Sequence, residues 1–152
     1  MTLVLFTLLL FAGPQDHDHS MVDKRGDKVM GFSHEKTTHH FLLYKDGGAI
    51  QVTANSADDT ASRDQIRQHL RHIASMFADG NFKAPMLVHA TNVPGTATMA
   101  ELKGKLKYKF EEIEGGARVR ISTADARALA ATHEFLRFQI SDHGTKDTGK
   151  VE

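Results

Sequence analysis

Histidine is the residue type that stands out in this chain, with ten among 152 residues, whereas cysteine is absent. Imidazole and thioether groups bind copper and zinc when two to four of them converge on one ion. The most suggestive set is His69-x-x-His72-x-x-x-Met76, because residues three and four apart on a helix lie on adjacent turns. These residues predict a copper or zinc site, with an ordinary polar helix flank as the alternative.

A second group of histidines lies within His34-Glu35-Lys36-Thr37-Thr38-His39-His40. The run has one residue too many for the His-Glu-x-x-His motif and leads into a strand, so it does not predict a metalloprotease. On a strand, His39 and His40 face opposite sides. We expect His39 to face the helices and lie near His69, and His34 is a further candidate ligand. The alternative is that His39 closes the core with its ring hydrogen-bonded.

Three other histidines have simpler interpretations. His133 lies in an apolar helical stripe, which is typical of a hydrogen-bonded core or interface histidine. His17 and His19 lie in a polar stretch, where they would bind Cu(II) only if signal cleavage left a terminus two residues before one of them.

Two β-hairpins are the elements expected to position these side chains. In the first, strands 37–44 and 49–54 flank Asp46-Gly47, which favours a tight turn. A turn there sets Leu43 opposite Ile50, Phe41 opposite Val52 and His39 opposite Ala54. In the second, a turn at Glu114-Gly115 pairs Phe110 with Val119 and Tyr108 with Ile121.

A helix is expected after each hairpin, with a short helix near 97–103 between the two halves. The first runs from about 61 to 78 behind the capping box Ser62-x-x-Gln65. The second runs from about 124 to 141. Their apolar stripes are predicted to be Ile66, Leu70, Ile73 and Phe77 in the first helix, and Leu129, His133, Leu136 and Ile140 in the second.

These elements predict an α+β fold in the order ββα-(α)-ββα, with an antiparallel sheet of about four strands and helices packed on one face. The similar runs Asp46-Gly-Gly-Ala49 and Glu114-Gly-Gly-Ala117 suggest an internal duplication. Against it, Ile50 and Val119 differ in phase by one residue after the glycines, so strict equivalence would need a bulge.

The first residues are typical of an export signal. Residues 1–12 are apolar and uncharged, and the run is too short to span a bilayer. We predict a signal peptide over 1–13, a polar tether over 14–28, one domain over 29–145 and a flexible tail over 146–152. The mature protein would be periplasmic or secreted, without a membrane span; the alternative is that residues 1–12 form a buried helix or strand.

Composition narrows the possible partners. With 19 basic and 19 acidic residues, the chain lacks the positive excess of a nucleic-acid-binding protein. Lysines alternate along 103–109 on one sheet face together with Arg118 and Arg120, which indicates either a solvated strand face or a surface for an acidic protein.

Three runs carry a resemblance to known sequences: residues 30–41 (MGFSHEKTTHHF), residues 62–73 (SRDQIRQHLRHI) and residues 133–140 (HEFLRFQI). They resemble blocks of a family of uncharacterised bacterial exported proteins, over about 23–145. That family has no established activity, so the resemblance implies only bacterial export and a single domain.

The function predicted from these features is an exported, non-catalytic domain that binds copper or zinc through His69, His72 and His39, assisted by Met76. The first alternative is a periplasmic interaction or scaffold module, such as a homodimer, with structural histidines. The second is an enzyme that uses His39 or His69 as general acid or base near Asp64 or Glu35.

Overall fold

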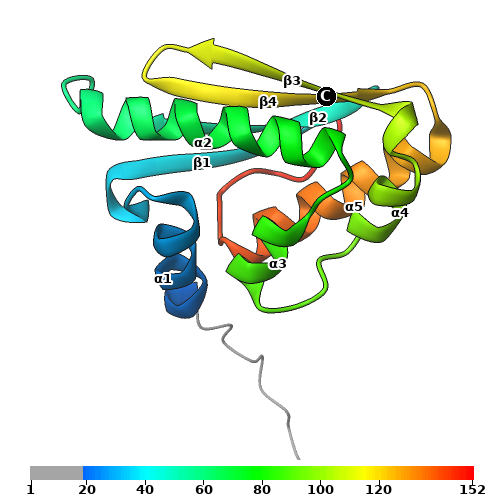
Figure 1. Ribbon diagram of the computed structural model, residues 1–152, viewed down its shortest axis with the longest axis horizontal. Helices are drawn as coiled ribbons and strands as arrows, with labels where there is room; N and C mark the ends of the chain where they lie inside the picture. Colours follow the sequence, from blue (N-terminus) through cyan, green and yellow to red (C-terminus); the bar gives the residue numbers. More distant parts are fainter. Residues whose placement is uncertain (1–18) are drawn as a thin grey trace, which may run out of the picture.

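The fold is a two-layer α+β structure, with a four-stranded antiparallel sheet covered by helices on one face (Figure 1). A computed structural model describes residues 19–152. The strands are β1 Thr37–Tyr44, β2 Gly47–Ala54, β3 Leu106–Ile113 and β4 Gly116–Thr123. Their order in the sheet is β1-β2-β4-β3. The predicted fold class and element order are therefore confirmed.

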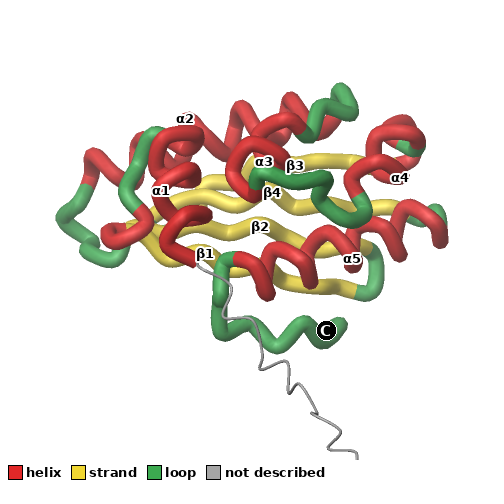
Figure 2. The backbone as a smooth tube through the Cα atoms, turned by 90° about the horizontal axis from the view of Figure 1, so that it is seen from below, coloured by secondary structure: helices red, strands yellow, loops and turns green. Residues whose placement is uncertain are grey.

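Two long helices lie along the sheet and leave a space between them. α2 (Thr60–Ala78) packs over β3 and β4, whereas α5 (Ala126–Asp142) packs over β1 and β2. α3 (Lys83–His89) lies between them in the view of Figure 2 and contacts α1 (His19–Met30). α4 (Thr96–Glu101) packs on α5. Short 3-10 turns, η1 His34–Lys36 and η2 Lys103–Lys105, precede β1 and β3.

The register of the second hairpin is as predicted, but that of the first is wrong by two residues. Phe41 pairs with Ile50, and the turn is Lys45-Asp46 rather than Asp46-Gly47. Both glycines after Asp46 belong to β2, and only glycine fits there, since a Cβ at Gly48 would clash with Leu136 of α5 and one at Gly47 with the Ile121 carbonyl. A shift of two preserves which side chains face the helices.

The two hairpins match without a bulge. Gly47 and Gly116 begin β2 and β4, and Ile50 pairs with Val119 at the centre of the sheet. Aligning the two glycines makes Ile50 and Val119 equivalent, which removes the phase difference. In the same alignment, His39 of β1 occupies the position that corresponds to Tyr108 of β3. This equivalence puts the two Gly-Gly-Ala runs one residue out of register, so the duplication stays a prediction.

The buried stripe of α2 is as predicted, whereas that of α5 is rotated. Ile66, Leu70, Ile73 and Phe77 are all buried. In α5, Leu129, His133 and Ile140 are only partly buried. The helix approaches the sheet through small residues instead, so its buried face comprises Ala128, Ala131, Thr132, Phe135, Leu136 and Gln139.

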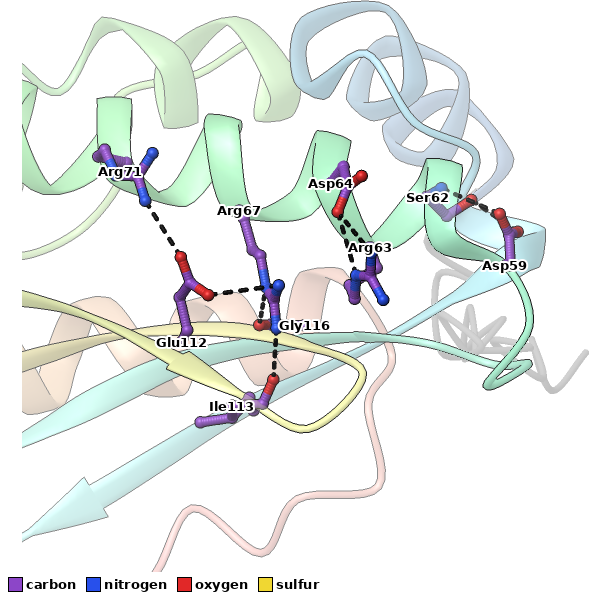
Figure 3. Close-up of polar contacts among 9 residues, drawn as sticks. All are labelled: Asp59, Ser62, Arg63, Asp64, Arg67, Arg71, Glu112, Ile113 and Gly116. Carbon is purple, nitrogen blue, oxygen red and sulfur yellow. Dashed lines mark hydrogen bonds and ion pairs between the residues drawn. The ribbon is translucent and has the colours of Figure 1, made fainter.

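The start of α2 also differs from the prediction. Asp59, not Ser62, caps the helix, and its carboxylate accepts hydrogen bonds from the Ser62 amide and hydroxyl (2.9 and 2.8 Å). Figure 3 shows this cap and a cluster that joins α2 to the second hairpin. In that cluster, Arg67 donates to the carbonyls of Gly116 and Ile113 and pairs with Glu112.

The segments predicted as tether and flexible tail are structured where they are described. Most of the tether is α1, which buries Val22, and Arg25 Nε donates to the Val88 carbonyl at 2.7 Å. The tail runs along β1: Asp147 accepts from the Phe41 amide, and the Glu152 amide donates to Leu43 (both 3.0 Å). Side-chain and backbone partners on neighbouring elements thus order both segments.

The predicted signal peptide, its alternative and His17 lie outside the described residues. Among the described helices, none is long and apolar enough to span a bilayer.

On the open face of the sheet, the predicted basic stripe is partly neutralised: Lys109 and Arg118 pair with Glu111, and Arg120 pairs with Asp46.

Candidate ligand pocket

A pocket of about 70 Å³ lies in the space between α2 and α5. The sheet forms its floor, and α3 and Met30 at the end of α1 contribute to its walls. Most of the lining is apolar, since Val, Ile, Leu and Phe side chains supply the floor and both flanks. Five polar side chains also line it: His39, His69, His89, Gln139 and His143.

His39 places an unsatisfied nitrogen at this pocket. It faces the helices from β1, as predicted, and its Nε2 is buried without a hydrogen-bond partner. The ring stacks on Phe32 and on His143, with centroids 6.0 and 5.8 Å away. Burial, and then the neighbouring His69 and His40, lower the pKa of His39 to about 4. The ring is therefore neutral at physiological pH, and the predicted hydrogen bond of a core-closing histidine is absent at Nε2.

His69 approaches the same pocket from α2, so the predicted meeting of β1 and α2 histidines takes place at one cavity. Phe32 lies beside both rings, with its centroid 5.7 Å from that of His69 in an edge-on arrangement. Burial, and then His72, lower the pKa of His69 to about 4. Two neutral imidazoles thus border a mainly apolar space.

A polar chain closes the end of the pocket near the C-terminus of α5. His89 is buried, its Nδ1 is hydrogen-bonded to Asp142, and its Nε2 lies 2.9 Å from Gln139 Oε1. The Gln139 Nε2 is buried and has no partner. Turning the amide over would leave the carbonyl oxygen in that place, so either orientation leaves one end of the Gln139 amide unsatisfied at the pocket.

The other predicted metal ligands lie elsewhere. His72 is exposed on α2, and Met76 packs against the core. His34 Nδ1 lies 2.9 Å from Asp27; although burial acts against it, this hydrogen bond and the Asp23 charge raise the pKa of His34 above its ordinary value. Within residues 19–152, no three His, Asp or Glu side chains are grouped as metal ligands. Of the predicted five-residue set, His39 and His69 line the pocket, and the other three do not.

The carboxylates named for an acid–base mechanism are also distant from the pocket lining. Asp64 is exposed and pairs with Arg63 at 3.0 Å, and Glu35 is exposed beside η1. The described lining contains no hydroxyl, carboxylate or amine side chain. The pocket thus has imidazole and amide groups that can hydrogen-bond a ligand.

Sequence reasoning did not identify three of the pocket's polar residues as part of a site. His89 belongs to α3, which the sequence patterns do not predict, Gln139 is not in the predicted apolar stripe of α5, and His143 lies beyond the predicted end of that helix. His133 behaves as expected, since its Nε2 donates to the carbonyls of Tyr44 and Gly47 at 2.9 and 3.0 Å. Gln139 lies four residues after Phe135, about one helical turn, and this spacing was the available signal that both side chains share one face of α5.

Comparison with known proteins adds no family to these observations: no family model, no curated protein and no solved structure matches the chain. The resemblance to uncharacterised exported proteins therefore stays a prediction, and function is argued from the pocket itself.

Proposed function

We propose that this protein is a non-catalytic binding domain for a small, uncharged and mainly apolar ligand, held between α2 and α5. The observation that carries the proposal is the pair of unsatisfied buried groups, His39 Nε2 and the Gln139 amide, at one pocket. A buried polar group without a partner costs about 1–3 kcal/mol, so a ligand that satisfies both gains that free energy on binding.

The lining defines the chemistry of the ligand. Apolar walls favour a hydrocarbon group, and the neutral His39 and His69 rings offer no positive charge to an anionic group. A ligand hydroxyl or amide would complete the hydrogen bonds of His39 and Gln139. The volume of about 70 Å³ restricts the buried part to a few heavy atoms, since an apolar cavity of about 150 Å³ is needed for benzene.

Titration with 1-butanol, followed by ¹⁵N NMR of the histidine rings and the glutamine amide, tests this function. We expect saturable shifts at His39 and Gln139 but not at exposed His72. Ala84→Leu, which extends a side chain on the pocket wall, should abolish the shifts, and Ala130→Leu on the exposed side of α5 should not. Shifts that persist in Ala84→Leu, or none in the unaltered protein, would refute the pocket as the binding site.

A copper or zinc ion held by His39 and His69 is the second candidate function. It is favoured by the buried, unpartnered Nε2 of His39 and by the low pKa values that keep both rings ready to ligate. Stoichiometric Cu(I), Cu(II) or Zn(II) binding that is lost in both His39→Leu and His69→Leu, but kept in His72→Ala, would support it. Binding unaffected by either leucine variant would exclude this pair.

Export remains a proposal that rests on the uncharged apolar run of residues 1–12. Fractionation of bacterial cells that express the full chain, with N-terminal sequencing of the product, tests it. A processed protein in the periplasm or medium supports export, whereas an unprocessed protein in the cytosol contradicts it.

A further inference from the structure

A second, larger hollow adjoins the pocket. This hollow of about 460 Å³ lies between α1, the edge of β1 and the turn that follows α5. Met30, His39 and His143 line both spaces, so the two meet at the stacked His39 and His143 rings. We call the second hollow the vestibule, because it is the larger and the more polar of the two.

The vestibule is polar where the pocket is apolar. Hydroxyl and amine side chains reach it from Thr38, Thr145 and Lys146. A molecule that occupies both spaces would therefore have one apolar end, enclosed between α2 and α5, and one hydrated end beside β1.

The charges around the vestibule are locally balanced. Asp23 lies 3.8 Å from His34 Nε2, while Asp27 is bonded to the other nitrogen of the same ring. On the opposite side, His40 Nδ1 lies 2.8 Å from Asp147. Apart from the imidazoles, the described lining carries one carboxylate, Asp23, and one amine, Lys146, so the walls present neither a cluster of cations for an anionic head nor one of anions for a cationic head.

Resting on the function proposed above, we infer that the ligand is a chain amphiphile with an uncharged polar head, such as an alcohol or amide, whose tail fills the pocket and whose head lies in the vestibule. An alkyl chain suits the inner space better than a ring system does, because that space holds only a few heavy atoms. The stacked His39 and His143 rings would lie beside the chain where it enters.

The test compares ligands of equal tail and different head by calorimetry: 1-octanol, octanoate and octylamine, with 1-butanol as the short reference. Each fully buried methylene is worth about fourfold in affinity. We expect 1-octanol to bind at least about tenfold more tightly than 1-butanol, since the outer methylenes are partly solvated. Octanoate and octylamine should both bind more weakly than 1-octanol.

A pair of variants locates the head. Lys146→Trp places a bulky ring at the vestibule wall and should reduce 1-octanol affinity to that of 1-butanol, while leaving 1-butanol binding unchanged. Lys150→Trp, further along the same tail and outside the vestibule, is the matched control and should change neither.

The inference is overturned if 1-octanol gains nothing over 1-butanol, if a charged head binds best, or if Lys146→Trp has no effect on 1-octanol. Those results leave the pocket itself intact provided that 1-butanol still binds and Ala84→Leu still prevents it. Loss of 1-butanol binding in the unaltered protein would instead remove the proposed function and this inference together.

Discussion

The rings of His39 and His143 lie nearly parallel, with an interplanar angle of 5° and centroids 5.8 Å apart. One ring comes from the edge strand β1 and the other from the residue that ends α5. Their contact joins the floor of the pocket to the end of the helix that forms one of its walls. Because both rings also line the vestibule, this is the point at which the environment changes from apolar to polar.

Stability should fall as pH falls from about 6.5 to 4. The folded-state pKa of His39 is about 4 against 6.5 for an unperturbed histidine, so the unfolded chain binds the proton first. Protonation of the unfolded state then costs the native protein about 3 kcal/mol of stability by pH 4. Urea denaturation between pH 7 and 4 measures this slope, to which His69 contributes in the same direction.

The variant His39→Leu should flatten that pH dependence, while exposed His72→Ala should leave it unchanged. If His39→Leu and the unaltered protein lose stability in parallel between pH 7 and 4, burial of the His39 ring is not the cause.

Arg67→Ala should destabilise the protein by about 1–2 kcal/mol, because it removes the donors to two backbone carbonyls at the second turn. Arg63→Ala, four residues earlier on α2, removes only an exposed pair with Asp64 and should cost less than about 0.5 kcal/mol. Thermal or urea unfolding compares the two. Equal losses would mean that the cluster in Figure 3 does not hold the hairpin to α2.

Gly48→Ala should be strongly destabilising, by about 3 kcal/mol or more, because the new methyl group overlaps Leu136 and the Leu42 carbonyl. Gly104→Ala is the control, since no atom lies within 4 Å of a Cβ there. Combining Gly48→Ala with Leu136→Ala should be less destabilising than the sum of both single changes. Strict additivity in a double-mutant cycle would contradict the contact.

Asp147→Ala should release the tail from β1. The hydrogen bonds that its carboxylate accepts from the Phe41 amide and the Thr145 hydroxyl outweigh burial and lower the pKa of Asp147, so the tail is held by the ionised form. Hydrogen exchange at the Phe41 amide should accelerate at least about tenfold, corresponding to loss of about 1.4 kcal/mol. Lys150→Ala should not change that rate, and equal exchange in both variants would show that Asp147 does not protect the edge.

Local patterns were sufficient for the sheet and the two long helices. In the second hairpin, alternation of Tyr108 and Phe110 with lysines gives the face of each side chain, and the turn at Glu114-Gly115 selects one register among the pairings that share that face. In the first hairpin, the Asp46-Gly47 signal for a turn competes with a packing demand from Leu136, which is distant in the sequence. The structure follows the packing demand.

The pocket required contacts that no local pattern contains. The prediction that His39 faces α2 follows from strand alternation, and the structure places His39 and His69 at one cavity. His89, Gln139 and His143 reach that cavity only because α3 crosses between the long helices and α5 turns Phe135 and Gln139 inward. The predicted stripe of α5 weighted Leu129 and Ile140 by their apolarity, whereas the small Ala128 and Ala131 decide which side can approach the sheet.

The equivalence of the two hairpins relates the position of the pocket to one difference between them. At the position where the first hairpin carries His39, the second carries Tyr108, whose ring packs edge-on against Phe77. A phenol is longer than an imidazole. Tyr108 therefore fills the space next to the second hairpin, whereas His39 leaves space next to the first. The space beneath the long helices thus lies at the hairpin where this position carries the smaller ring.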